Sequence, residues 1–109
     1  MALTTNTLTH TGGIANHAVG RIVTDGGTAA ATTITVGFVP RVVKFHNLTD
    51  RISDEWYEGM AAASSRHIVA AGTVTLETTN GITVNTDGTF TVTATTMVAS
   101  KTFAWEAIG

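Results

Sequence analysis

Residues 81–93 read GITVNTDGTFTVT, and this stretch decides the fold class. Apolar side chains alternate with threonine or asparagine on both sides of Asp87-Gly88. Such alternation places successive side chains on opposite faces of a β-strand. Asp-Gly is a strong signal for the tight turn of a hairpin, and Asn80-Gly81 gives a second turn signal just before the stretch. The stretch therefore predicts two short antiparallel strands that follow a first tight turn.

The same pattern continues over most of the chain, and no segment has the 3.6-residue period of a helix. The strands predicted from it lie at residues 17–24, 32–39, 41–48, 51–58, 66–70, 74–76, 82–84, 89–93 and 102–108. The Ala-rich segment 59–65 is too short for an independent helix and is predicted as a loop or one helical turn. Eight or so short strands at a spacing of roughly 8–12 residues predict an all-β fold, a small β-sandwich or barrel.

The two tryptophans have different predicted environments. Trp105 alternates with apolar neighbours near the chain end and is predicted in the core. Trp56 shares its strand face with Asp54 and Glu58, so it is predicted at a rim or an interface. Because neither face of segment 51–58 is purely apolar, that segment is predicted as an edge strand or an interface strand.

The first 16 residues differ from the rest of the chain. They are Thr-rich, contain Gly12-Gly13 and show neither a helix nor a strand period. Their sizeable apolar residues are Leu3, Leu8 and Ile14. We predict an extended N-terminal arm over residues 1–16, which becomes ordered on contact with a neighbouring subunit, and a single β domain over residues 17–109.

Charge is unusually sparse. Charged residues make up 13% of the 109 residues, about half of the roughly 25% in a typical soluble domain. Threonine accounts for about a fifth of the chain, and the net charge is −2. A weakly charged surface risks self-association unless neighbours cover it. The composition therefore favours a subunit of an assembly; a neutral Thr-rich soluble surface is the alternative. Together with the mixed faces of segment 51–58, the sparse charge predicts a closed homo-oligomer, which we expect to be a homotrimer.

Several functional classes find no support in the sequence. No basic run suits nucleic acid, and the N-terminus lacks the pattern of a secretory signal. No apolar run approaches the roughly 20 residues of a membrane helix. The chain has no cysteine, which fits synthesis in a reducing cytoplasm. We expect no nucleic-acid partner and no membrane partner.

The polar residues that could carry chemistry lack the required spacing. The four histidines, His10, His17, His46 and His67, do not form a zinc motif. The carboxylates Asp50, Asp54, Glu55 and Glu58 match no calcium loop, and Arg51 lies close enough in sequence to neutralise one of them. A solvated or ion-paired face is the preferred interpretation of these carboxylates, ahead of metal binding or catalysis. No serine lies in a nucleophile elbow. We therefore expect no enzyme activity, no metal and no cofactor.

A group of short motifs resembles a known family. They are Phe38-Val39-Pro40-Arg41-Val42-Val43-Lys44, Asn47-Leu48-Thr49-Asp50-Arg51, Glu55-Trp56, Gly59-Met60-Ala61, Val69-Ala70-Ala71-Gly72, Thr75-Leu76-Glu77-Thr78, Gly81-Ile82-Thr83-Val84 and Ala104-Trp105. Together they make about two thirds of the chain similar to small virion structural proteins of tailed bacteriophages. The match does not extend clearly into residues 1–16.

This resemblance implies a β-rich particle subunit, in particular a capsid decoration or cement protein on the head surface. Such proteins bind the major capsid protein, often as trimers at local three-fold positions, and stabilise the head. A position in the tail or neck stays open, as does a carbohydrate-binding module with Trp56 and Tyr57 as a stacking platform. The residues predicted at protein interfaces are Leu3, Leu8, Ile14, Arg41, Arg51, Trp56 and Tyr57.

Overall fold

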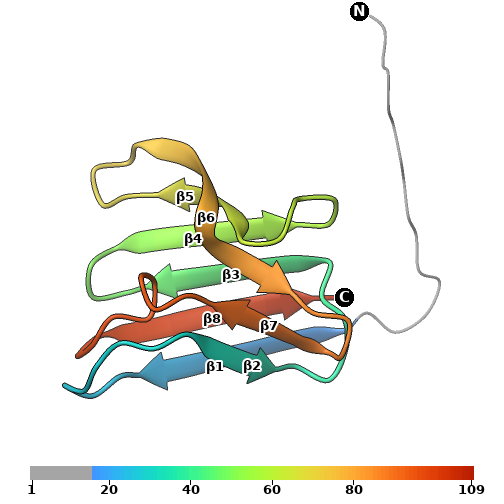
Figure 1. Ribbon diagram of the computed structural model, residues 1–109, viewed down its shortest axis with the longest axis horizontal. Coiled ribbons are helices and arrows are strands. Elements are labelled where there is room, and N and C mark those ends of the chain that lie inside the picture. The colour runs from blue at the N-terminus through green and yellow to red at the C-terminus, as the bar shows by residue number, and fades with distance from the viewer. Residues whose placement is uncertain (1–15) are drawn as a thin grey trace, which may run out of the picture.

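The computed structural model describes residues 16–109 as eight β-strands (Figure 1). The strands are β1 (His17–Val23), β2 (Thr32–Thr35), β3 (Val42–Asn47), β4 (Ile52–Tyr57), β5 (Ser64–Ile68), β6 (Val74–Val84), β7 (Thr89–Val92) and β8 (Thr102–Ile108). No helix forms in this part of the chain, so the predicted all-β class is confirmed. The predicted arm, with Leu3, Leu8 and Ile14, lies outside the described residues except for Asn16.

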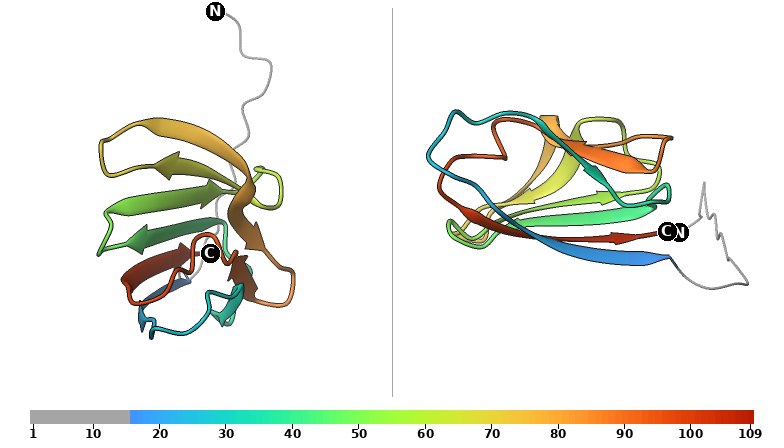
Figure 2. Two further views of the ribbon diagram at one scale, coloured as in Figure 1. Left: turned by 60° about the vertical axis from the view of Figure 1, so that its left-hand side comes forward. Right: turned by 90° about the horizontal axis from the view of Figure 1, so that it is seen from below.

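All eight strands belong to one antiparallel sheet with the order β1-β8-β3-β4-β5-β6-β7-β2. The sheet curls, so that β7 and β2 lie across the interior from β3, β8 and β1 (Figures 1 and 2). The long strand β6 belongs to both halves, because its first part pairs with β5 and its last part with β7. Since β1 and β2 end the strand order without pairing to each other, the result is a half-barrel rather than a closed barrel.

Two loops cross between the halves and fasten one end of the half-barrel. The Thr24 hydroxyl donates a hydrogen bond to the Val98 carbonyl at 2.8 Å, and the Thr24 amide donates to the Lys101 carbonyl at 2.9 Å. The Ser100 amide donates to the Asp25 carbonyl at 2.8 Å. These bonds satisfy backbone groups that the strands do not pair.

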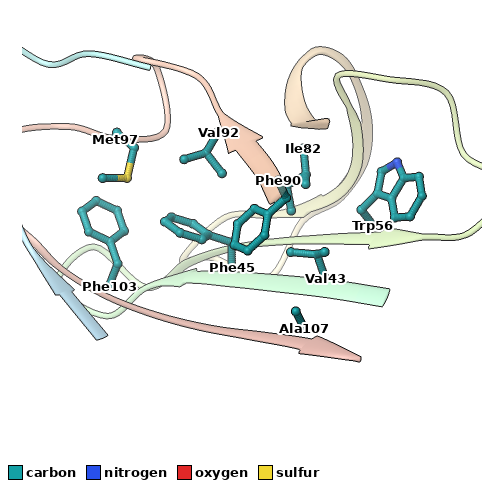
Figure 3. Close-up of a cluster of buried hydrophobic side chains, with 9 residues drawn as sticks. All are labelled: Val43, Phe45, Trp56, Ile82, Phe90, Val92, Met97, Phe103 and Ala107. Carbon is teal, nitrogen blue, oxygen red and sulfur yellow. The ribbon is translucent and has the colours of Figure 1, made fainter. Parts of the chain in front are cut away.

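The core fills the interior with side chains from both halves (Figure 3). Its buried members are Val43, Phe45, Trp56, Ile82, Phe90, Val92, Met97, Phe103 and Ala107. Phe45 contacts Phe90 edge-to-face at 6.4 Å between ring centroids, and Phe90 contacts the partly buried Trp105 at 5.5 Å. These aromatic contacts join the two halves of the sheet, and the predicted core position of Trp105 is confirmed in this partly buried form.

Two sequence-based expectations need correction. First, of the two alternatives for segment 51–58, an edge strand or an interface strand, the edge strand is wrong, because β4 pairs with β3 on one side and with β5 on the other. Second, Asn80-Gly81 forms no turn and lies inside β6. A side chain at Gly81 would overlap the Ser64 backbone, where the β5–β6 register shifts. Glycine therefore permits a close approach of two strands here, which is the other common role of a glycine in a strand.

The structure also bears on membrane insertion by helices. Within residues 16–109 there is no helix that is long and apolar enough to span a bilayer.

Candidate functional site

The outer face of the sheet, which points away from the core, is the first candidate. One row of side chains crosses it from strand to strand at paired positions: Val19, Glu106, Lys44, Glu55, Arg66 and Leu76. The four central members alternate in charge sign, so opposite charges face each other across neighbouring strands. Such pairs stabilise a sheet, whereas like charges in direct opposition would destabilise it.

Ion pairs neutralise the centre of this face further. Glu55 Oε1 lies 3.0 Å from Arg66 Nη1 and also accepts a hydrogen bond from the Tyr57 hydroxyl at 3.3 Å. Glu106 Oε2 lies 2.7 Å from His17 Nε2. The hydrogen bond from His17 holds the pKa of the Glu106 carboxyl below its ordinary value. The centre of the outer face therefore carries charges but little net charge.

Both ends of the outer face carry exposed apolar side chains. At the β1 end, Val19 is 67% exposed and Val23 is 63% exposed, with the exposed Arg21 between them on the same side of the strand. At the β6 end, Leu76 is 68% exposed, and Val74 and Tyr57 are also exposed. We call Val19 with Val23 the β1 patch, and Tyr57, Val74 and Leu76 the β6 patch. Apolar groups gathered at two separate places on a small domain are typical of contact surfaces for other proteins.

The predicted interface residues divide between different environments. Tyr57 belongs to the β6 patch. Arg41 lies just before β3, with its Nε 3.1 Å from Glu58 Oε2. Arg51 is exposed at the turn between β3 and β4, with a positive φ of 59°, and forms no ion pair with any residue from 16 to 109, contrary to the expectation that it neutralises a carboxylate. Leu3, Leu8 and Ile14 lie outside the described residues.

The prediction for Trp56 is wrong. The side chain is only 8% exposed and belongs to the core, and its indole N–H donates to the Ala61 carbonyl at 3.3 Å. Trp56 faces the interior because it lies on the same side of β4 as the buried Asp54, whereas Tyr57 lies on the other side. The polar residue on the same face, Asp54, misled the sequence argument, because that carboxylate is itself buried.

The inner face holds the second candidate, a pocket of about 250 Å³. Its walls come from β3, the β3–β4 turn, β4, β5, β6 and the loop before β8. The lining residues are Phe45, Asn47, Asp50, Ile52, Asp54, His67, Glu77, Asn80, Thr95, Thr96 and Val98. We call this space the inner pocket. It combines an apolar base with several acidic and amide side chains, which is the composition of a small binding site.

Asp54 is the most unusual residue of the inner pocket. Its side chain is 4% exposed, and its Oδ1 accepts hydrogen bonds from Ser65 Oγ at 2.6 Å and His67 Nδ1 at 2.9 Å. Burying a carboxylate is costly unless hydrogen bonds and an opposite charge compensate for lost water. Both compensating groups come from β5, the neighbouring strand. Asp54 is therefore ion-paired, as the sequence predicted for the carboxylate cluster, but it is buried rather than solvated.

The Ser65, His67 and Asp54 side chains do not have the connectivity of a hydrolase triad. In such a triad the serine hydroxyl bonds to the histidine, which turns its other nitrogen to the aspartate. Here the Ser65 hydroxyl bonds directly to Asp54. Among residues 16–109, no group of three or more histidine, aspartate or glutamate side chains has the arrangement of a metal site.

Comparison with known proteins supplies no relative. No family model matches the chain, and neither the curated proteins nor the solved structures contain a match. The site is therefore interpreted from its own geometry.

Sequence reasoning found the acidic side of the inner pocket only in part. It grouped Asp50 with Asp54, but it did not bring His67, Glu77 or Asn80 to them, because strand pairing joins these residues across the sheet. The available signal was a carboxylate between two apolar residues on one strand face, Ile52 and Trp56. Such a residue can indicate a buried charge with a partner on the next strand.

Proposed function

We propose that this chain is a structural subunit of a tailed-bacteriophage particle, a capsid decoration protein that binds the major capsid protein and stabilises the head. The observation that carries the proposal is the outer face, with apolar patches at both ends and a charge-compensated centre. Covering the exposed apolar side chains with another protein is favourable, and charges that face opposite charges at the centre cost less to cover than unpaired charges would. The resemblance of the sequence motifs supplies the particle; the outer face supports the binding role.

The positions of the two patches favour a cyclic homo-oligomer. The β1 patch and the β6 patch lie at opposite ends of one row of side chains, so a single copy cannot cover one with the other. A contact between the β1 patch of one copy and the β6 patch of the next is heterologous, and such contacts form a ring when the rotation between copies closes. We infer a ring from the two patches, and we take its size, a homotrimer, from the sequence-based expectation.

Native mass spectrometry tests this proposal, on the chain alone and with the major capsid protein of the same phage. We expect a trimer alone and a capsid-bound form in the mixture. Val19→Glu and Leu76→Glu should each abolish the trimer, whereas Leu48→Glu, at the exposed tip of the β3–β4 turn, should not. A chain that stays monomeric at tens of micromolar and does not bind capsid would refute the proposal.

The same assay addresses the arm and the position in the particle. Deleting residues 2–13 should leave the domain folded but weaken capsid binding. Binding to purified tails instead of heads would assign the chain to the tail or neck.

The structure leaves the carbohydrate-binding alternative with one of its two predicted stacking residues. Trp56 is buried, so Tyr57 is the one member of the predicted aromatic pair that a sugar could stack on. We therefore do not favour it, and a glycan array provides the check.

A further inference from the structure

The inner pocket presents mainly hydrogen-bond acceptors to whatever occupies it. Both hydrogen bonds to Asp54 end on Oδ1, so Oδ2 has no partner within residues 16–109. His67 uses Nδ1 toward the Asp54 carboxylate, which assigns the proton of the neutral ring to Nδ1 and leaves Nε2 as an acceptor. A carboxylate buried beyond nine-tenths, with one oxygen free on a pocket wall, is a strong site for a donor.

The charged groups around the pocket leave an excess of negative charge. Glu77 bonds only to the backbone amide of Thr78, and it forms no ion pair with any residue from 16 to 109. Asn47 is occupied, since its amide donates to Asp50 Oδ2 and its carbonyl accepts from the Asp50 amide. Lys101 compensates Asp50 at 3.0 Å. The three carboxylates Asp50, Asp54 and Glu77 therefore outnumber the two possible cations, Lys101 and His67, by one even when His67 is charged.

Size and apolar lining restrict the occupant. A pocket of about 250 Å³ is smaller than the roughly 300–1,000 Å³ of sites for drug-sized ligands. Phe45, Ile52 and Val98 supply apolar walls, which suit the methylene stem of a long basic side chain. The guanidinium group has five donors and no acceptor, and it is the cation best suited to pairing with carboxylates away from water.

We propose that the inner pocket receives the arginine side chain of another protein subunit. The guanidinium pairs with Asp54 Oδ2 and the Glu77 carboxylate, and its stem lies against the apolar walls. The inference rests on the proposed function in one respect, namely that the arginine belongs to a protein partner. Arginine is enriched among the few residues that dominate protein interfaces, so one such contact can determine partner choice.

The test uses Nα-acetyl-arginine amide as the probe, followed by NMR of the full-length chain. We expect saturable shifts at Asn80, His67 and Thr96, and none at the outer face. Nα-acetyl-citrulline amide is the matched control, because it replaces the charged guanidinium by a neutral urea and should not bind. The lysine analogue should bind more weakly than the arginine probe. Equal binding of the citrulline probe, or shifts only on the outer face, would overturn the proposal.

Variants assign the binding to the two carboxylates. Glu77→Gln should lower the affinity for the arginine probe by about tenfold, as expected for loss of a charge-assisted hydrogen bond. Glu106→Gln, on the outer face, should leave the affinity unchanged. Asp54→Asn keeps a carbonyl oxygen for Ser65 and His67 and should abolish binding. If Asp54→Asn does not fold, Glu77→Gln alone decides, and unchanged affinity in that variant contradicts the proposal.

The outcome is separable from that of the proposed function. If the chain binds the arginine probe but no phage particle, the pocket proposal stands and the proposed capsid role is refuted. If the chain binds particles but not the probe, the proposed capsid role stands and the pocket proposal is refuted.

Discussion

Two ion pairs join β4 to β5 at consecutive positions and face opposite sides of the sheet. Asp54 pairs with His67 toward the interior, and Glu55 pairs with Arg66 toward solvent, with nearly equal separations of 2.9 Å and 3.0 Å. Their surroundings differ, because the Asp54 and His67 side chains are 4% and 30% exposed, whereas the Glu55 and Arg66 side chains are 17% and 49% exposed. Geometry alone therefore does not determine how much an ion pair contributes to the stability of the fold. Burial decides what happens when one partner is lost.

The neighbouring aromatic residues extend this comparison and give the largest expected effect. Trp56→Ala should lower the free energy of unfolding by about 3–5 kcal/mol, because it removes a buried side chain and leaves a cavity. Tyr57→Ala, one residue later on the outer face, should change it by about 1 kcal/mol or less. Urea denaturation of both variants measures the difference. Similar losses for both would contradict the inner and outer assignment of β4.

Substitutions in the two ion pairs should give the next largest changes in the free energy of unfolding. His67→Ala removes one of the two hydrogen-bond donors to a buried carboxylate and leaves only Ser65, so we expect a loss of about 2–3 kcal/mol. Arg66→Ala leaves Glu55 with access to water and should cost about 1 kcal/mol or less. Chemical denaturation at pH 7 provides both values. If Arg66→Ala were the more damaging change, burial would not be the deciding factor.

The same contrast explains how far the sequence could predict the structure. Alternation along each strand correctly predicted the all-β class, since that period depends on local geometry alone. It could not tell which face of segment 51–58 is internal, because Asp54 made both faces polar. That choice depends on Ser65 and His67 of another strand, which no local pattern connects to Asp54.

Gly81 shows a second reason why the sequence did not predict the whole structure. Asn-Gly between alternating residues is a hairpin signal in most sequences, and the local argument was sound. The deciding contact is the Ser64 backbone, 17 residues away in sequence, which leaves no space for a side chain at Gly81. The inner pocket escaped prediction for the same reason, because its walls come from four strands, a turn and a loop. Sequence predicted the elements, and pairing between distant strands determined the site.

The pair of Asp50 and Lys101 at the pocket wall has a more exposed carboxylate than either pair compared above, and it gives the smallest effect. The hydrogen bond from Lys101 is the main reason that the pKa of Asp50 lies below its ordinary value of 3.8. A lowered pKa means that the pair stabilises the fold above the ordinary carboxyl pKa, and that this contribution is lost as the pH falls through the folded value. Lys101→Met should therefore raise the pKa of Asp50 in an NMR titration, with little change in stability at pH 7 because both side chains are about one-third exposed.

The same variant also tests the pocket. Without Lys101, the Asp50 carboxylate adds an uncompensated negative charge to the pocket wall, so the arginine probe should bind more tightly than to the unchanged chain. Lys44→Met is the matched control, because Lys44 lies on the outer face and should alter neither the pKa of Asp50 nor the affinity for the probe. An unchanged Asp50 pKa in Lys101→Met would contradict the assigned hydrogen bond. A raised pKa with unchanged probe affinity would show that Asp50 does not act on the occupant, and would confine the charge recognition to Asp54 and Glu77.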